Sequence, residues 1–205
     1  MYRILNAWIA VLFCALFAFS APVRANEGTD VIGTVARIQT SIVVKQNTLP
    51  QILNAGSNIQ LGDIISTNKK AQVEIVMSDR ANLTFVERTH FVVQEYVIHK
   101  GGNDSVMRLL EGAFKVTSAK LMQTADASFI INTHTETIGI CGTTFWGGSM
   151  DGDFEVALLA GKRVYLETKA GWGDLTTIGD DTKFRGASLA PSKLKKLDRK
   201  KLIGR

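Results

Sequence analysis

The chain has 205 residues and a formal net charge of +5, with 24 Lys or Arg residues against 19 Asp or Glu residues. The first 25 residues carry two of the positive charges and residues 193–205 carry a net +6, which leaves −3 for residues 26–192. This distribution excludes a basic domain that binds nucleic acid along its surface. One of the two cysteines lies in the N-terminal apolar run, which excludes a fold built on intrachain disulfides.

The N-terminus has the pattern of a secretory signal peptide over residues 1–25. Arg3 provides the positive charge, residues 7–19 are apolar without interruption, and small residues occupy the cleavage-site positions. The apolar run is shorter than the roughly 20 residues that a membrane-spanning helix needs, although a retained membrane anchor is the alternative. We therefore expect an exported protein, periplasmic or secreted, whose mature chain begins at Asn26.

Between residues 30 and 184, short runs with a period of two predict β-strands. In the run 71–77, for example, Val73, Ile75 and Met77 face one side and polar residues face the other. The β-branched and aromatic content of these runs favours strands over helices. In chain order the runs are 35–44, 59–67, 71–77, 82–87, 90–98 and 105–110.

Two segments in the second half share a Leu-Leu-x-Gly sequence followed by a strand-like run, residues 109–116 and 158–166. The glycine in each segment suits the positive φ of a hairpin turn. Residues 120–128 are a candidate for a helical turn or a long loop, and residues 174–184 for a last hairpin. The sequence predicts one all-β domain over residues 26–184, built of many short strands and solenoid- or sandwich-like.

Taken in order, these segments resemble the FecR-like domain family, which is typified by the periplasmic part of regulators in cell-surface iron signalling. The family marks are a Gly-Asp pair followed by Thr, an aliphatic strand that ends in an acidic turn, a Leu-x-x-Gly strand, and a Gly-Thr-x-Phe segment. The matching residues are Gly62, Asp63, Thr67, Ala71, Val73, Ile75, Asp79, Leu109, Gly112, Gly142, Thr143 and Phe145. The resemblance covers residues 31–168.

Two residues depart from the family pattern. Cys141 stands where the family has an arginine before Gly-Thr, and Arg80 stands where a glycine usually follows the strand-ending aspartate. The family's regulators carry a cytoplasmic anti-sigma segment and a transmembrane helix before this domain, whereas this sequence shows only the signal peptide. We therefore expect a free-standing exported module and do not carry transmembrane sigma regulation over to it.

Cys141 has two interpretations, a nucleophile exposed on a tight turn or a strand residue beside a bend. A nucleophilic thiol needs a base and an orienting group. The L,D-transpeptidase motif places His-Gly directly before its cysteine, but here Gly139 and Ile140 precede Cys141, and His134 is seven residues back. We interpret Cys141 as a strand residue next to a bend at Gly142.

The remaining polar and aromatic candidates favour structural roles. His90, His99 and His134 are too widely spaced for a zinc site, and residues 150–155 read more readily as a hairpin turn than as a calcium loop. Core filling or covering the end of a sheet is favoured over sugar stacking for Trp146 and Trp172, which both lie beside glycines. We therefore predict no catalytic, cofactor-binding or metal-ligating residue.

The Gly62-Asp63 pair is expected to form a turn or bulge between two strand halves. Asp63 is expected to accept hydrogen bonds from backbone amides two residues further on, as in Asx turns. This role is architectural, because no second carboxylate lies nearby in sequence to form an acid–base pair.

The sequence thus predicts an exported, non-enzymatic FecR-like module, regulatory or structural, that binds a protein or a glycan of the cell envelope. One alternative is a cysteine-dependent cell-wall hydrolase or transpeptidase. The other is a structural part of a surface or secretion assembly.

Residues 185–205 form a basic tail in which a short amphipathic helix would place Leu194 and Leu197 on one side; a solvated, frayed terminus is the alternative. We expect removal of residues 193–205 to leave the thermal transition unchanged, because the segment follows the last predicted strand. Binding to vesicles with anionic lipid should be lost, and added salt should mimic that loss. Sedimentation with vesicles tests this, and vesicle binding by the truncated protein would place the contact on the β domain.

Overall fold

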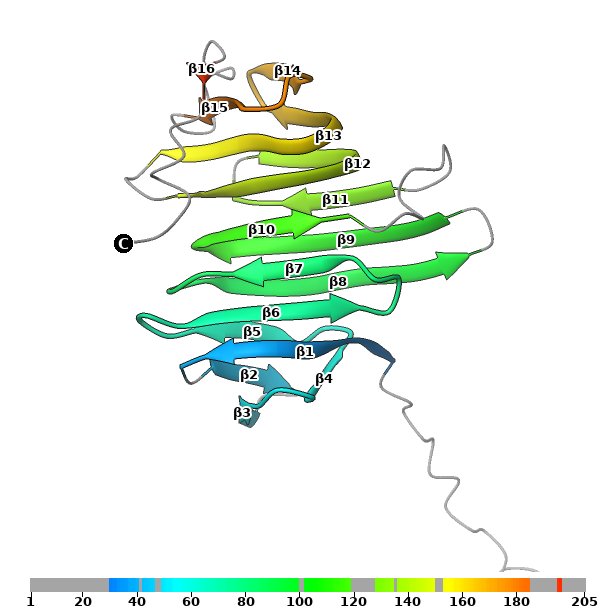
Figure 1. Cartoon of the computed structure of the whole chain (residues 1–205), viewed down its shortest axis with the longest axis vertical. Coiled ribbons are helices and arrows are strands. Elements are labelled where there is room, and N and C mark those ends of the chain that lie inside the picture. Colours follow the sequence, from blue (N-terminus) through cyan, green and yellow to red (C-terminus); the bar gives the residue numbers. More distant parts are fainter. Residues whose placement is uncertain are drawn as a thin grey trace, which may run out of the picture.

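A computed structural model describes residues 30–40, 42–46, 49–99, 102–118, 128–134, 136–149, 153–184 and 195–196. The predicted signal peptide and the candidate turn or loop at 120–127 lie outside these ranges. Within them every regular element is a β-strand, and the 16 strands belong to one sheet (Figure 1). The all-β prediction is confirmed. The described residues contain no helix long and apolar enough to cross a membrane.

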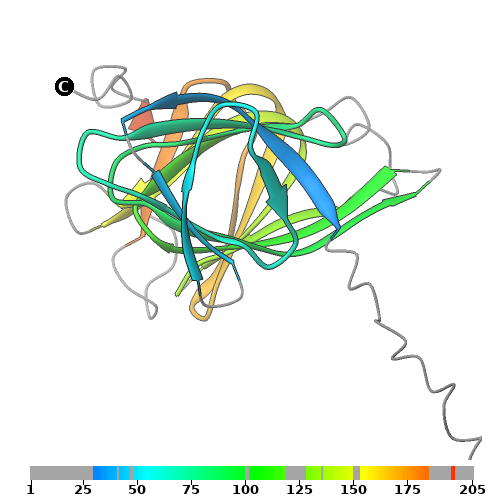
Figure 2. The same cartoon turned by 90° about the horizontal axis from the view of Figure 1, so that it is seen from below.

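The sheet curls on itself to give two walls around one interior (Figure 2). The first wall has the order β3-β2-β5-β8-β9-β11. Its strands are β2 (Ile42–Gln46), β3 (Leu49–Leu53), β5 (Ile64–Thr67), β8 (His90–His99), β9 (Gly102–Glu111) and β11 (Ser128–Asn132). The second wall has the order β10-β7-β6-β1-β4. Its strands are β1 (Val31–Gln39), β4 (Asn58–Gln60), β6 (Gln72–Met77), β7 (Asn82–Phe85) and β10 (Ala113–Thr117).

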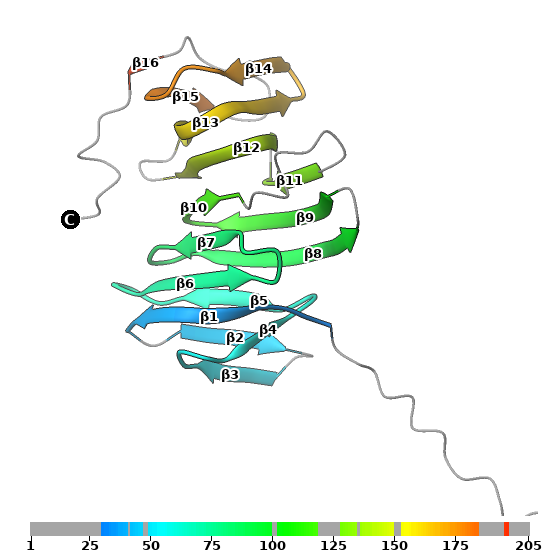
Figure 3. The ribbon, with the colours of Figure 1, turned by 45° about the vertical axis from the view of Figure 1, so that its right-hand side comes forward.

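Two long strands, β12 (Glu136–Ser149) and β13 (Phe154–Thr168), join the walls at one end (Figures 1 and 3). The first half of β12 pairs with β11 and its second half pairs with β10. The strands β14 (Gly171–Leu175) and β15 (Asp180–Phe184) pair with opposite halves of β13. The hairpin predicted at residues 174–184 is therefore wrong, because its two strands pair with β13 on different walls.

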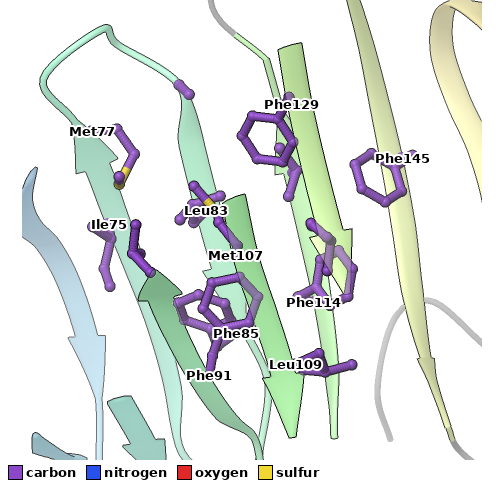
Figure 4. Packing of buried hydrophobic residues seen from close by; sticks show 14 of the residues in the cluster. Ile75, Met77, Leu83, Phe85, Phe91, Met107, Leu109, Phe114, Phe129 and Phe145 are labelled. Atoms are coloured by element: carbon purple, nitrogen blue, oxygen red, sulfur yellow. The ribbon is translucent and has the colours of Figure 1, made fainter. Parts of the chain in front are cut away.

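The inner faces of both walls share one hydrophobic core, because alternate residues along each strand point inward. Four phenylalanines connect the walls in series: Phe85, Phe91, Phe114 and Phe145 are each fully buried. The successive ring centroids are 4.6, 5.9 and 5.5 Å apart (Figure 4). Since Phe91 comes from the first wall and the other three from the second, these contacts hold the walls together.

The chain crosses from one wall to the other at corners, and residues with positive φ lie at these corners. Nine corners in the described part each contain one such residue, with φ between 55° and 101°. These residues are Thr40, Gly56, Gly62, Lys70, Arg88, Gly112, Gly142, Gly161 and Gly179. At Gly161 a Cβ atom would also lie 2.4 Å from the carbonyl oxygen of Gly142, so the corner admits no side chain.

These corners explain where the predicted elements differ from the observed ones. The run 35–44 is broken at Thr40 into β1 and β2, which lie on different walls. The positive φ predicted for Gly112 and Gly161 is confirmed. The hairpin turns predicted there are wrong, because Gly112 joins strands on different walls and Gly161 bends β13. The predicted break at Gly62 is confirmed, since it lies in the turn between β4 and β5.

Buried threonines satisfy backbone groups at successive corners. The Thr67 hydroxyl donates to the carbonyl of Val86 at 2.5 Å and accepts from the amide of Thr89 at 2.8 Å. The Thr89 hydroxyl in turn bonds both the amide and the carbonyl of Ala113, at 3.1 and 3.0 Å. A stack of corners is thereby connected through side chains where ladder hydrogen bonds are interrupted.

In the C-terminal tail, the structure describes Lys195 and Lys196, which form the short strand β16 beside Asp180 and Asp181 of β15. The helix interpretation is wrong at these two residues, and so is the expectation that residues 193–205 lie beyond the last strand. Vesicle binding through the tail stays a prediction.

The corners can be tested with glycine substitutions. Gly62→Ala should lower the free energy of unfolding by about 1–2 kcal/mol, because space around this Cβ is open and only positive φ is penalised. Gly161→Ala should lower the free energy of unfolding by about 1–3 kcal/mol more than Gly62→Ala does, because its Cβ would also clash with backbone atoms. Gly139→Ala is the control, since its Cβ makes only an ordinary contact at 3.7 Å with Tyr165. Urea unfolding measures all three, and equal losses at Gly62 and Gly161 would contradict this account.

Candidate functional site

Cys141 lies within β12, opposite Arg163 of β13, and directly precedes the bend at Gly142, where φ is 58°. The predicted strand position and bend are confirmed, while the side chain of Cys141 lies outside the described part. His134 lies in the turn before β12. The five residue-to-residue steps from Glu136 to Cys141 extend about 17 Å along the strand. His134 is therefore too distant to act as a base for Cys141.

The histidines take separate positions. The Nδ1 atom of His90 lies 2.8 Å from the Oγ atom of Ser66, directly across the β5–β8 ladder, and Glu111 is the next residue in the row. Sequence reasoning missed this pair, because 24 residues separate its members. The Ser66–His90 pair lies on two adjacent strands, and its hydrogen bond connects them. His134 is exposed, and the described residues contain no group of three or more His, Cys, Asp or Glu arranged to hold a metal ion.

The segment 150–155 connects β12 and β13, whose pairing ends at Ser149 and Phe154. The antiparallel pairing of these consecutive strands agrees with the hairpin interpretation, while the turn residues 150–152 lie outside the described part. Glu155 is already part of β13 and is buried, which removes it from any loop that could surround a calcium ion.

Asp63 has an architectural position at the turn between β4 and β5. Its Oδ2 atom accepts a hydrogen bond from the amide of Gln60 at 2.8 Å. This donor lies three residues before Asp63, so the expected donor two residues after it was wrong. Burial raises the pKa of the Asp63 carboxyl above 3.8, and the bond from Gln60 opposes this in part. The other carboxylate oxygen is buried without a hydrogen-bond partner.

The two tryptophans of the β domain have opposite environments. Trp146 is 6% exposed, so the prediction that it is covered is confirmed. Trp172 is 67% exposed, so core filling is wrong for this residue. Sequence could not separate them, because both follow the same local pattern of an indole beside glycine.

Trp172 belongs to a cluster on the outer face of β13 and β14, which we call the aromatic patch: Arg163, Tyr165, Trp172 and Asp174. The alternation of β13 places Val164 and Leu166 in the core and the residues between them outside. The Tyr165 and Trp172 rings are stacked, with centroids 6.5 Å apart and planes inclined by 20°.

A bidentate ion pair fixes the polar side of the patch. The guanidinium of Arg163 donates from Nε and Nη2 to the two carboxylate oxygens of Asp174, at 3.0 and 2.7 Å. It also lies 6.0 Å from the centroid of the Tyr165 ring. The pair is solvent-exposed and contributes little stability, so its main effect is to orient the groups around the aromatic rings.

Comparison with known proteins supports the fold and the family resemblance. The family model described as "FecR protein" matches residues 63–162. No curated protein matches the chain. Two crystal structures of a "putative anti-sigma factor" from Parabacteroides distasonis, at 1.65 and 2.50 Å resolution, are similar, each with a TM-score of 0.53 and 15% identity. Each match covers 68% of this chain and 62% of the solved chain, and at this identity it shows the fold alone.

The buried carboxyl of Asp63 predicts a pH dependence. Because its pKa is raised on folding, the folded state binds the proton more tightly, and this stabilisation is lost as pH rises through the raised pKa. Asp63→Asn mimics the protonated carboxyl at every pH and keeps an oxygen for the Gln60 amide.

Relative to this variant, the unsubstituted protein should gain stability as the pH falls from 7 towards 4, by at most about 1.4 kcal/mol per pH unit. Urea unfolding across this range measures the difference. Asp30→Asn, at an exposed position, is the control, and parallel curves for the unsubstituted protein and Asp63→Asn would contradict the assignment.

Proposed function

Because this chain carries a FecR-like domain, matched over residues 63–162, we propose that it is an exported, non-enzymatic regulatory module that binds a partner of the cell envelope. Export rests on the signal-peptide pattern of residues 1–25. The regulatory role rests on the family, and the similar fold of the "putative anti-sigma factor" is consistent with it.

The exposed indole of Trp172 is the observation that carries the proposed binding function. The Trp172 side chain has 67% of its surface exposed, and covering this apolar surface with a partner would be favourable. Trp, Tyr and Arg are the residue types that dominate binding hot spots. Here the Arg163–Asp174 pair and the Tyr165 ring hold the arrangement before any ligand arrives, which lowers the ordering cost of binding.

The position of Cys141 argues against the transpeptidase alternative, because His134 is too far along the chain to serve as its base. A structural role in an assembly has one favourable observation. The edge strand β3 exposes Leu49 and Ile52, at 68% and 69%, and among the described strands it pairs only with β2. Exposed edges of this kind favour association, but Pro50 lies within the strand and lacks the amide that an added strand would need.

Photo-crosslinking tests the binding proposal. A diazirine-bearing tryptophan analogue at position 172, which keeps the indole, should give a defined adduct with an envelope component in cells, and the same amino acid at Lys115, exposed on the second wall, should not. Trp172→Ala should weaken binding by about 30-fold or more, as expected for a hot-spot truncation of about 2 kcal/mol. Equal adducts at both positions, or none at 172, would remove the aromatic patch as the binding site.

A further inference from the structure

The outer face of the first wall continues from the aromatic patch as a row of polar residues. We propose that this face binds a neutral, linear glycan laid across the strands, with one sugar ring stacked on Trp172. The inference rests on the proposed binding function and specifies its ligand.

The row follows from the strand register. Trp172 lies opposite Glu167, which lies opposite Thr137. Thr137 lies opposite Asn132, and Asn132 opposite Arg108. The five side chains therefore occupy one outward row on β14, β13, β12, β11 and β9. With neighbouring strands about 4.8 Å apart, the row extends about 19 Å, a length suited to a short oligosaccharide rather than to a single small molecule.

Trp172 supplies the stacking surface of the proposed site. Its side chain is 67% exposed, and Asp174, the next outward residue of β14, is held by Arg163. Gly139 lies between Ile130 and Tyr165 in the adjacent row and has no side chain, which lowers the surface next to the Tyr165 ring. The C–H face of a pyranose is apolar and flat, and it fits an exposed aromatic ring of this kind.

The rest of the row supplies hydrogen-bonding groups for sugar hydroxyls. Glu167 is exposed next to Trp172 and offers carboxylate acceptors. Thr137 donates through Oγ1 to the Oδ1 atom of Asn132 at 3.1 Å. That bond orients the Asn132 amide and leaves its NH2 group as a donor. A row with an aromatic platform at one end and fixed donors and acceptors beyond it matches the alternating apolar and polar surfaces of a glycan.

The charge and area of this face favour a neutral glycan over the alternatives. Glu167 and Arg108 carry opposite charges, and Arg163 is already bonded to Asp174, so the face offers no excess charge to an anionic ligand. A stable protein interface buries about 800 Å² per partner around an apolar centre. Within the row itself the one apolar side chain is the indole of Trp172, and the other four residues are polar.

The experiment uses the mature chain from Asn26 and three tetrasaccharides, cellotetraose, chitotetraose and maltotetraose, with the indole N–H signals of Trp146 and Trp172 as reporters in NMR titrations. At least one sugar should shift the Trp172 signal saturably and leave the Trp146 signal unchanged. Trp172→Ala should weaken that binding at least tenfold, and Asn132→Ala should weaken it several-fold. Ile178→Ala, at an exposed apolar position outside the row, should leave it unchanged.

No binding of any of the three sugars up to about 10 mM, above the millimolar range of weak specific binding, would overturn the glycan inference. If Trp172 then still crosslinks to an envelope protein, the proposed function stands and its ligand is a protein. If neither sugar nor protein contact depends on Trp172, both proposals fall. Sugar binding that survives Trp172→Ala would also overturn the inference, because stacking on this indole is its central element.

Discussion

Closure of one sheet around its own core is the constraint on which the rest of the molecule depends. A sheet with one apolar face must cover that face, and here the second wall covers the first. The chain therefore passes repeatedly between walls, and each of nine passages places one residue at positive φ. Asp63, Thr67 and Thr89 bond backbone groups at or beside these corners. The corners are therefore needed to close the sheet around its core.

Local features of the fold could be predicted from the sequence, and its long-range pairings could not. The period of two in 71–77 identifies a strand with its inward face, because that pattern depends only on neighbours along the chain. The glycine of each Leu-Leu-x-Gly segment indicates positive φ, but hairpin turns and wall-to-wall corners need the same conformation. Gly112 and Gly161 were therefore assigned to the wrong kind of turn. The burial of Trp146 and the exposure of Trp172 depend on what lies over each face, which neither local sequence contains.

The residues that carry the family resemblance are mostly architectural. Gly62, Gly112 and Gly142 form corners, while Thr67 satisfies a corner and Phe145 fills the core. A match on such residues reports how the sheet closes. The aromatic patch follows the matched segment directly, on an outer face that closure does not constrain. This separation explains why the family could be recognised from the sequence while the residues of the aromatic patch were not predicted as a binding site.

The continuity of β13 has a consequence for how this protein can change in evolution. This strand supplies core residues to both walls and outer residues to the aromatic patch. Gly161 forms the bend between its two halves. Inserting or deleting one residue inside the second half would exchange its faces, turning Tyr165 inward and a core leucine outward. Changes of length are therefore confined to the hairpin ends, and new binding specificity on this face must arise by substitution alone.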